Sequence, residues 1–137
     1  MENNLETVEP EKDATYQIIG CVYEAYKTLG PGLLESMYQK ALYLELQSVG
    51  FDVRREVEIT PMYKGSPIGE NLRIDLLVND EIILELKSVD HLTDLHKKQL
   101  LTYLRITNKE VGLLINFNES YLKNGIIRIV NNYKKTI

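Results

Sequence analysis

The sequence predicts an α/β fold in which a mixed β-sheet is flanked by α-helices. Two observations support this class. Segments that are apolar at helical spacing alternate along the chain with short segments that are apolar at every second position. In chain order they give two helices, three strands, a helix and two strands, as expected for a sheet covered by helices. The length of 137 residues predicts one domain over residues 13–137, after a disordered tail over residues 1–12.

The first elements of the domain are two helices. Residues 13–29 carry apolar side chains at helical spacing, and the Gly-Pro-Gly sequence at residues 30–32 ends that helix. A second helix covers about residues 33–49. Residues 51–63 have apolar residues among charges and predict a strand, and residues 64–67 predict a turn.

A β-hairpin follows, with strands at residues 72–78 and 82–87 and a polar turn at residues 79–81. In both strands the even-numbered residues are apolar. The two even-numbered sets share one buried face only if even positions stand opposite even positions, because a slip of one residue moves a whole set to the other face. This register pairs Val78 with Ile82, Leu76 with Leu84, and Ile74 with Leu86.

The last elements are a helix and two strands. Residues 93–107 predict a helix that is capped by Thr93 or by Asp90. Residues 111–116 and 126–130 are short apolar runs, each consistent with a strand.

The hairpin register sets Asp75 opposite Glu85, and Lys87 on the same side of the sheet as Glu85. Like charges at opposed positions are destabilising. A divalent cation would relieve that repulsion, since Mg²⁺ is held by one or two carboxylates together with water and phosphate oxygens. The alternative is an ordinary solvated face of an antiparallel sheet.

Two further polar residues lie on predicted helical stripes. Glu35 shares a largely apolar stripe with Tyr38, so it is expected to face inward, although an acidic residue also suits a helix N-terminus. Gln99 is expected on a core-facing stripe with Tyr103, where an amide needs hydrogen-bond partners. Gln99 is therefore either a structural amide or a ligand for phosphate or for a site residue.

The composition is that of a soluble globular protein, with 44% hydrophobic and 26% charged residues. The net charge of −4 argues against a protein that coats nucleic acid. No apolar run has the length of a membrane span, and the N-terminus has no signal-peptide core. Cys21 stands among apolar residues and is expected to be a buried thiol. These features predict a cytoplasmic protein that does not bind membranes.

The segment from Gly32 to Tyr38 carries a G-x-x-E-x-x-Y pattern, and the chain resembles the GxxExxY protein family. The resemblance covers about residues 14–130, and its other matching segments are 73–75, 85–87, 99–105 and 111–117. That family is similar to the PD-(D/E)XK nuclease superfamily, which implies a restriction-endonuclease-like mixed sheet flanked by helices. One departure is Ile74, which stands where the name of the superfamily has proline.

The resemblance implies a site that uses Mg²⁺ or Mn²⁺. Asp75 and Glu85 would hold the metal with the backbone carbonyl of Leu86, and Glu35 would assist directly or through water. Lys87 would orient the attacking water or stabilise charge on the phosphorane-like transition state. Glu35, Asp75, Glu85 and Lys87 are therefore the expected catalytic residues.

The same resemblance gives Gln99 and Tyr103 the task of positioning the substrate backbone or bracing the lysine. The expected function is metal-dependent hydrolysis of phosphodiester bonds in nucleic acid, with DNA as the first choice of partner. The alternative is a catalytically silent module of the same fold that binds nucleic acid or a protein. A homodimer or a partner protein stays open.

Overall fold

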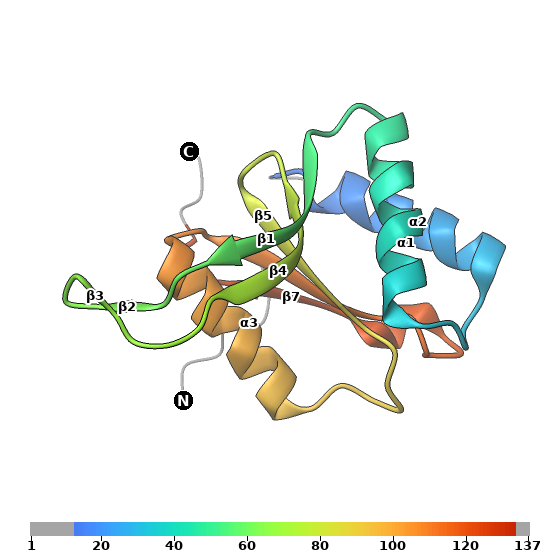
Figure 1. Ribbon diagram of the computed structural model, residues 1–137. Coiled ribbons are helices and arrows are strands. Elements are labelled where there is room, and N and C mark those ends of the chain that lie inside the picture. The colour runs from blue at the N-terminus through green and yellow to red at the C-terminus, as the bar shows by residue number, and fades with distance from the viewer. Residues whose placement is uncertain (1–12, 134–137) are drawn as a thin grey trace.

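The computed structural model describes residues 13–133, so the tail predicted over residues 1–12 lies outside the described residues. The elements in chain order are α1 (Thr15–Leu29), α2 (Glu35–Ser48), β1 (Val53–Ile59), β2 (Met62–Tyr63), β3 (Ser66–Pro67), β4 (Leu72–Val78), β5 (Ile82–Lys87), α3 (Asp94–Thr107), β6 (Val111–Asn116), the 3₁₀ turn η2 (Leu122–Gly125) and β7 (Ile126–Val130). They form a mixed sheet flanked by helices, which confirms the predicted fold class (Figure 1).

The main sheet has five strands in the order β1-β4-β5-β6-β7. Strands β5 and β6 are parallel, and every other neighbouring pair is antiparallel. Helix α3 is the connection between β5 and β6, as parallel neighbours require a crossover. Strands β2 and β3 form a separate two-stranded ribbon that projects from the body of the molecule (Figure 1).

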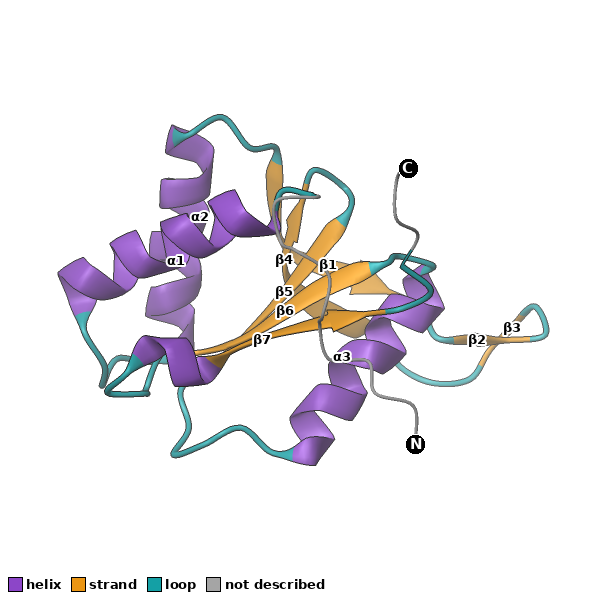
Figure 2. Cartoon of the chain, turned by 180° about the vertical axis from the view of Figure 1, so that it is seen from behind, coloured by secondary structure: helices purple, strands orange, loops and turns teal. Residues whose placement is uncertain are grey.

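Helices cover both faces of this sheet, with α1 and α2 on one side and α3 on the other (Figure 2). The larger apolar cluster joins α1 and α2 to one face, and a smaller cluster joins α3 to the other. All six residues of β6 are buried for this reason. Burial on both faces explains why β5 and β6 read as nearly continuous apolar runs rather than as alternating strands.

The predicted register of the hairpin is confirmed near its turn but not along its whole length. Val78 pairs with Ile82 and Leu76 with Leu84, across the predicted turn at residues 79–81. Ile74, however, packs in the smaller cluster under α3, on the opposite face from Leu76. The prediction that all even positions share one face was therefore wrong at Ile74.

Strand β1 changes face at the same level of the sheet. Val53 packs under α1 and α2, whereas Val57 packs on the α3 side, so strict alternation is broken between them. Glu56 lies in that interval with a φ of 54°. Its position in the register with β4 is opposite Asp75. In both neighbouring strands, the apolar side chains thus switch from one face of the sheet to the other next to Asp75, the first carboxylate of the predicted site.

Most predicted boundaries agree with the structure to within two residues. The exception is the strand predicted over residues 51–63, which divides at Thr60 and Pro61 into β1 and the short β2. The predicted turn at residues 64–67 shortens to Lys64 and Gly65, because the next two residues pair as β3. Within residues 13–133, no helix has the length and apolar character needed to cross a membrane.

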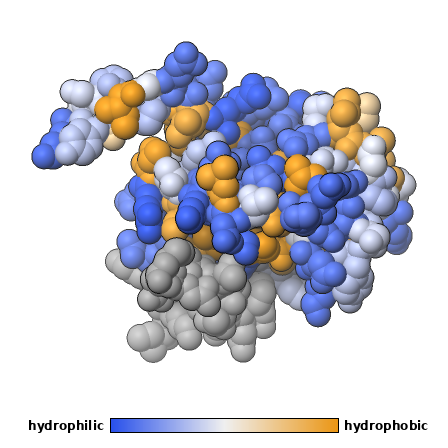
Figure 3. All heavy atoms as spheres, turned by 90° about the horizontal axis from the view of Figure 1, so that it is seen from below, coloured by the Kyte–Doolittle hydropathy of each residue, from blue (hydrophilic) through white to orange (hydrophobic). Residues whose placement is uncertain are grey.

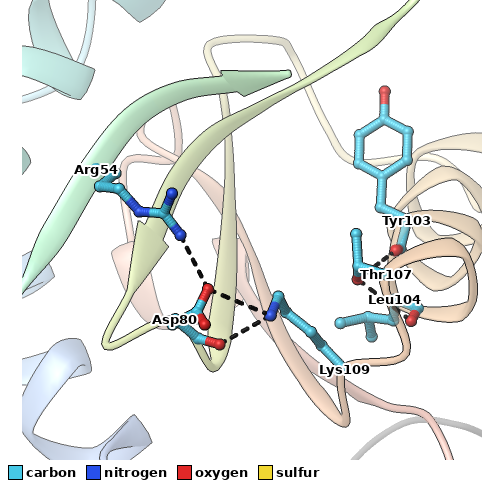
Figure 4. A network of polar contacts seen from close by, with 6 residues as sticks. All are labelled: Arg54, Asp80, Tyr103, Leu104, Thr107 and Lys109. Atoms are coloured by element: carbon cyan, nitrogen blue, oxygen red, sulfur yellow. Dashed lines mark hydrogen bonds and ion pairs between the residues drawn. The ribbon is translucent and has the colours of Figure 1, made fainter. Parts of the chain in front are cut away.

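Ion pairs and a hydrogen bond hold the turn between β4 and β5 in place (Figure 4). The carboxylate of Asp80 pairs with Arg54 of β1 at 2.9 Å and with Lys109 at 3.5 Å. Lys109 also donates to the backbone carbonyl of Asp80 at 2.8 Å. The turn is thereby held to β1 on one side and to the segment after α3 on the other.

Candidate active site

Strands β4 and β5 separate where the two predicted carboxylates begin. The ladder of backbone pairs ends at Leu76 and Leu84. Beyond it, the backbone N–H of Asp75 donates to Glu85 Oε2 at 3.1 Å, and the backbone N–H of Leu86 donates to Asp75 Oδ2 at 2.8 Å. Each carboxylate therefore takes the place of a strand partner and satisfies a backbone donor that the separation would leave unpaired.

Burial and mutual repulsion oppose ionisation of this carboxylate pair. Glu85 is only 8% exposed. Burial, followed by the charge of Asp75, raises the pKa of Glu85 to about 8. Burial also raises the pKa of Asp75, and the Glu35 charge adds to this, while the Leu86 N–H and Lys87 act in the opposite direction. At neutral pH and without a cation, the pair is expected to retain a proton.

The free oxygens of the pair suit a hard divalent cation. Asp75 and Glu85 each commit one oxygen to a backbone N–H, which leaves Asp75 Oδ1 and Glu85 Oε1 available. Among residues 13–133, no three His, Cys, Asp or Glu side chains gather closely enough to hold a metal by themselves. Two carboxylates match Mg²⁺, which keeps several waters and shares substrate phosphate oxygens. The residues present therefore fit such an ion.

Lys87 lies on the last position of β5, two residues after Glu85, and is half-buried. Its positive charge lowers the pKa values of both Asp75 and Glu85, so its ammonium lies within electrostatic range of the pair. The backbone carbonyl of Lys87 accepts the N–H of Phe117 at 3.0 Å. The backbone of this lysine is thus anchored at the end of β5.

Glu35 borders the site but does not face inward. It is the first residue of α2 and is exposed, so the prediction of an inward side chain was wrong. An apolar stripe does not predict burial for the first residue of a helix, because no preceding helical turn covers its side chain. Glu35 Oε2 accepts the backbone N–H of Ser88 at 3.2 Å, and its charge raises the pKa values of Asp75 and Glu85.

The loop before α2 is held by the tyrosine of the G-x-x-E-x-x-Y pattern. The Tyr38 hydroxyl donates to the carbonyl of Gly30 and accepts the N–H of Leu33 at 3.1 Å. Its ring is fully buried and stacks on Phe117 with centroids 4.3 Å apart. Gly32 has a φ of 105°, which favours glycine at this position. The pattern therefore shapes the loop that delivers Glu35 to the end of β5.

Gln99 and Tyr103 lie on α3 with different exposures. Gln99 is exposed, and among residues 13–133 its side chain makes no hydrogen bond, so the predicted core-facing stripe was wrong. The buried side of α3 consists of Leu100, Leu101 and Leu104. Tyr103 is half-buried and packs against the α3-side core. Burial raises the pKa of Tyr103, and the charges of Glu85 and Asp75 raise it further, so the pair acts on this hydroxyl electrostatically.

Two polar residues that the sequence analysis did not select support the end of β5. Asn116 is fully buried beside Lys87 in the parallel register. Its Oδ1 accepts the N–H of Val89 at 3.1 Å, and its Nδ2 donates to the Val89 carbonyl at 2.9 Å. Ser88 donates its hydroxyl to the Leu33 carbonyl at 2.8 Å. A polar residue closing an apolar strand was the signal that could have identified Asn116.

His96 caps α3 rather than joining the carboxylates. Its Nδ1 accepts the N–H of Thr93, and its own N–H donates to Thr93 Oγ1, which together form a capping box. The predicted cap at Thr93 is thereby confirmed. Burial and the Lys87 charge lower the pKa of His96.

Comparison with models of protein families gives a match. The family model described as PD-(D/E)XK nuclease superfamily matches residues 12–129. No curated protein matches the chain, and no solved structure matches it. The matched residues include both carboxylates, the lysine and every element of the five-stranded sheet except the last residue of β7. The fold is the restriction-endonuclease-like arrangement, and the chain belongs to the PD-(D/E)XK nuclease superfamily.

Proposed function

We propose that this protein is a nuclease that hydrolyses phosphodiester bonds of nucleic acid with the help of Mg²⁺ or Mn²⁺. The observation that carries the proposal is the buried Asp75–Glu85 pair at the point where β4 and β5 separate, with Lys87 next to it. A structural role alone does not account for two carboxylates that repel each other inside a sheet. DNA is the first candidate among nucleic acids.

The metal would be held by Asp75 Oδ1 and Glu85 Oε1, with the Leu86 carbonyl and, through water, Glu35. A divalent cation bound there supplies Lewis-acid activation of the phosphate and of the attacking water. Glu35 is suited to an outer position, because its carboxylate is exposed and already accepts the Ser88 N–H. In this arrangement Asp75 and Glu85 would both be ionised in the presence of the cation, and the proton of the pair would pass to solvent.

Lys87 would orient the attacking water and stabilise charge on the phosphate oxygens in the transition state. An ammonium group is a compact point charge that suits this task. Tyr103, whose pKa the charges of the pair raise, would position the substrate backbone or brace the lysine. Gln99 would contact the substrate from its exposed position on α3.

The chain would also belong to the GxxExxY family within the superfamily. Support comes from the loop that the pattern builds: Tyr38 holds Gly30 and Leu33, and Glu35 reaches Ser88 at the end of the catalytic strand.

The test is a cleavage assay with single-stranded, duplex and branched DNA and with RNA, in Mg²⁺, Mn²⁺ or EDTA. Lys87→Ala should abolish cleavage while leaving metal binding intact, because the lysine holds no metal. Lys27→Ala is the matched control, since this lysine lies on α1 with a side chain that is 78% exposed. It should cleave as the unaltered protein does.

Cleavage that persists in Lys87→Ala would contradict the role of the lysine. A folded, metal-binding protein that cuts none of these substrates would favour the silent module that binds nucleic acid or a protein partner.

A further inference from the structure

Residues 60–71 form a projecting hairpin, here called the arm, which contains β2 and β3. Met62 pairs with Pro67 and Tyr63 with Ser66, around a turn at Lys64 and Gly65. Both turn residues have positive φ values, 49° and 85°, as in the tight hairpin turns of natural sheets. In the view from below, the arm stands clear of the body, with apolar atoms exposed between hydrophilic ones (Figure 3).

The direction of the arm is fixed at its base. Thr60 Oγ1 donates to Asn71 Oδ1 at 2.7 Å, and Asn71 Nδ2 donates to Glu58 Oε1 at 3.0 Å. The N–H of Ile68 donates to the carbonyl of Pro61 at 3.0 Å. Polar bonds thus join the two sides of the arm where it leaves the sheet, so its orientation is set before any partner binds.

The arm presents apolar side chains that take no part in either core cluster. Met62 is 51% exposed, Tyr63 is 61% exposed and Ile68 is 65% exposed. Lys64 lies over the Tyr63 ring, with its ammonium 5.4 Å from the centroid. Apolar and aromatic side chains gathered on a projecting segment point to an interaction surface, because they do not stabilise the fold.

The arm leads directly into the strand that carries the carboxylate pair. Its last residue is followed by Leu72, the first residue of β4, and Asp75 is the third residue after Leu72. At a rise of about 3.3 Å per residue, the base of the arm is roughly 13 Å from Asp75 along the strand. A substrate bound at the pair would therefore lie within reach of the arm.

The charge at the tip of the arm favours an anionic partner. Residues 60–69 contain Lys64 and no acid, and the acid of the arm, Glu70, lies at its base. Cationic and aromatic side chains together suit contacts to phosphates and bases. A second copy of this acidic chain is a less suitable partner on charge grounds.

We propose that the arm enters the major groove of duplex DNA beside the bond to be cleaved; this rests on the proposed nuclease function and names its substrate class. The B-form major groove, about 12 Å wide, admits a two-stranded ribbon. The deep, narrow major groove of A-form RNA does not. Lys64 contacts a phosphate, and the apolar side chains contact base edges such as thymine methyl groups.

The experiment measures binding rather than cleavage. The full chain is titrated against a labelled DNA duplex, a single strand of the same sequence and an RNA duplex, with Ca²⁺ present and the intactness of the DNA checked on a gel. The test variant is Tyr63→Ala/Lys64→Ala. The matched control is Tyr16→Ala/Lys27→Ala, which removes an exposed tyrosine and an exposed lysine from α1.

The test variant should lose about tenfold or more in affinity for duplex DNA, with little change for the single strand. Lys64→Ala alone should reduce the slope of log affinity against log salt by about 1. The control should bind as the unaltered protein does. Thermal unfolding should be unchanged in all of them, because the altered side chains are exposed.

Duplex affinity of the test variant within about twofold of the unaltered protein would overturn the inference, since one lost phosphate contact alone should exceed this. A change in sedimentation behaviour with unchanged DNA affinity would also overturn it and assign the arm to self-association. Loss of duplex binding in a protein that never cleaves DNA would support the arm and refute the nuclease. Cleavage that persists with full duplex affinity in the test variant would refute the arm alone.

Discussion

The backbone N–H of Asp75 donates to the carboxylate of Glu85 at 3.1 Å, across the point where their strands part. Asp75 in turn accepts the N–H of Leu86 from the strand of Glu85 at 2.8 Å. This reciprocal exchange orients both side chains toward the gap between the strands. The stability of the sheet therefore depends on whether the two carboxylates are protonated.

The first prediction concerns the pH dependence of stability in EDTA. The pKa of Glu85 is about 8 in the folded protein, above its ordinary value of 4.5, so the folded state binds more protons than the unfolded state between these values. The free energy of unfolding should therefore fall as the pH rises from about 5 to 8, by more than about 1 kcal/mol. Urea unfolding at several pH values measures this.

Glu85→Gln is the matched variant, because it keeps an oxygen acceptor for the Asp75 N–H and removes the ionisation. Its free energy of unfolding should change less over the same pH range. Equal pH dependence in the two proteins would show that Glu85 ionises normally.

The second prediction concerns the effect of metal on thermal unfolding. A ligand that binds only the folded state raises the unfolding temperature with its concentration. Mn²⁺ should therefore raise the unfolding temperature of the unaltered protein. Asp75→Asn should abolish that rise, and in EDTA it should unfold at a temperature equal to or above that of the unaltered protein, since a repulsion is gone. Differential scanning calorimetry gives both results.

Glu24→Gln provides the comparison for the metal experiment, because this acid is exposed on α1, away from the pair. It should respond to Mn²⁺ like the unaltered protein. If Asp75→Asn responds equally, the cation binds elsewhere.

The third prediction concerns the loop before α2. Tyr38→Phe removes the hydroxyl that donates to Gly30 and accepts the N–H of Leu33. Leaving these partners unpaired should lower the free energy of unfolding by about 1–3 kcal/mol, and cleavage should fall because Glu35 is less well placed. Tyr43→Phe is the control, since its hydroxyl pairs with Gln47 at an exposed position and should cost under about 0.5 kcal/mol. Denaturant unfolding distinguishes the two.

The fourth prediction concerns the ion pair between Asp13 and Arg128, whose atoms are 2.6 Å apart. Burial acts to raise the pKa of Asp13, but hydrogen bonds from Thr15 and the Arg128 charge leave it below its ordinary value. This carboxylate therefore adds stability above pH 4 that is lost as the pH falls through its folded-state pKa, at about pH 4 and below. Asp13→Asn should lower the free energy of unfolding at pH 7 by about 1–3 kcal/mol and flatten that acid dependence. Equal acid unfolding midpoints would contradict the prediction.

The sequence alone predicted the strands and turn of the β4–β5 hairpin, and with them the meeting of Asp75 and Glu85. This succeeded because strand periodicity and turn length together allow only one register. It failed at Ile74, where the strands separate and β4 changes face. That change depends on the neighbouring strand and on covering helices, which local periodicity does not describe.

The site was predicted better in its strand residues than in its helix residues. Glu35 and Gln99 were expected on inward stripes, yet both are exposed. The spacing of residues on a helix predicts which side chains share a face, but not whether another element packs against that face. At a helix end or on an outer face, no element covers these side chains. Asn116 was missed for the opposite reason, since its role depends on Val89, which is distant in sequence.

The two hydrogen bonds between the carboxylates of Asp75 and Glu85 and the backbone of the opposite strand indicate which sequence changes would mark an inactive relative. Asp75 and Glu85 serve the architecture as well as the proposed chemistry, because each accepts a backbone N–H. A chain without cleavage would still need an oxygen acceptor at both positions, and Asn and Gln supply one without the negative charge. The ammonium of Lys87 has no such structural role, since among residues 13–133 it forms no hydrogen bond or ion pair. Replacement of either acid by its amide, or of the lysine by any uncharged residue, is therefore the change expected in a relative that keeps this fold without hydrolysis.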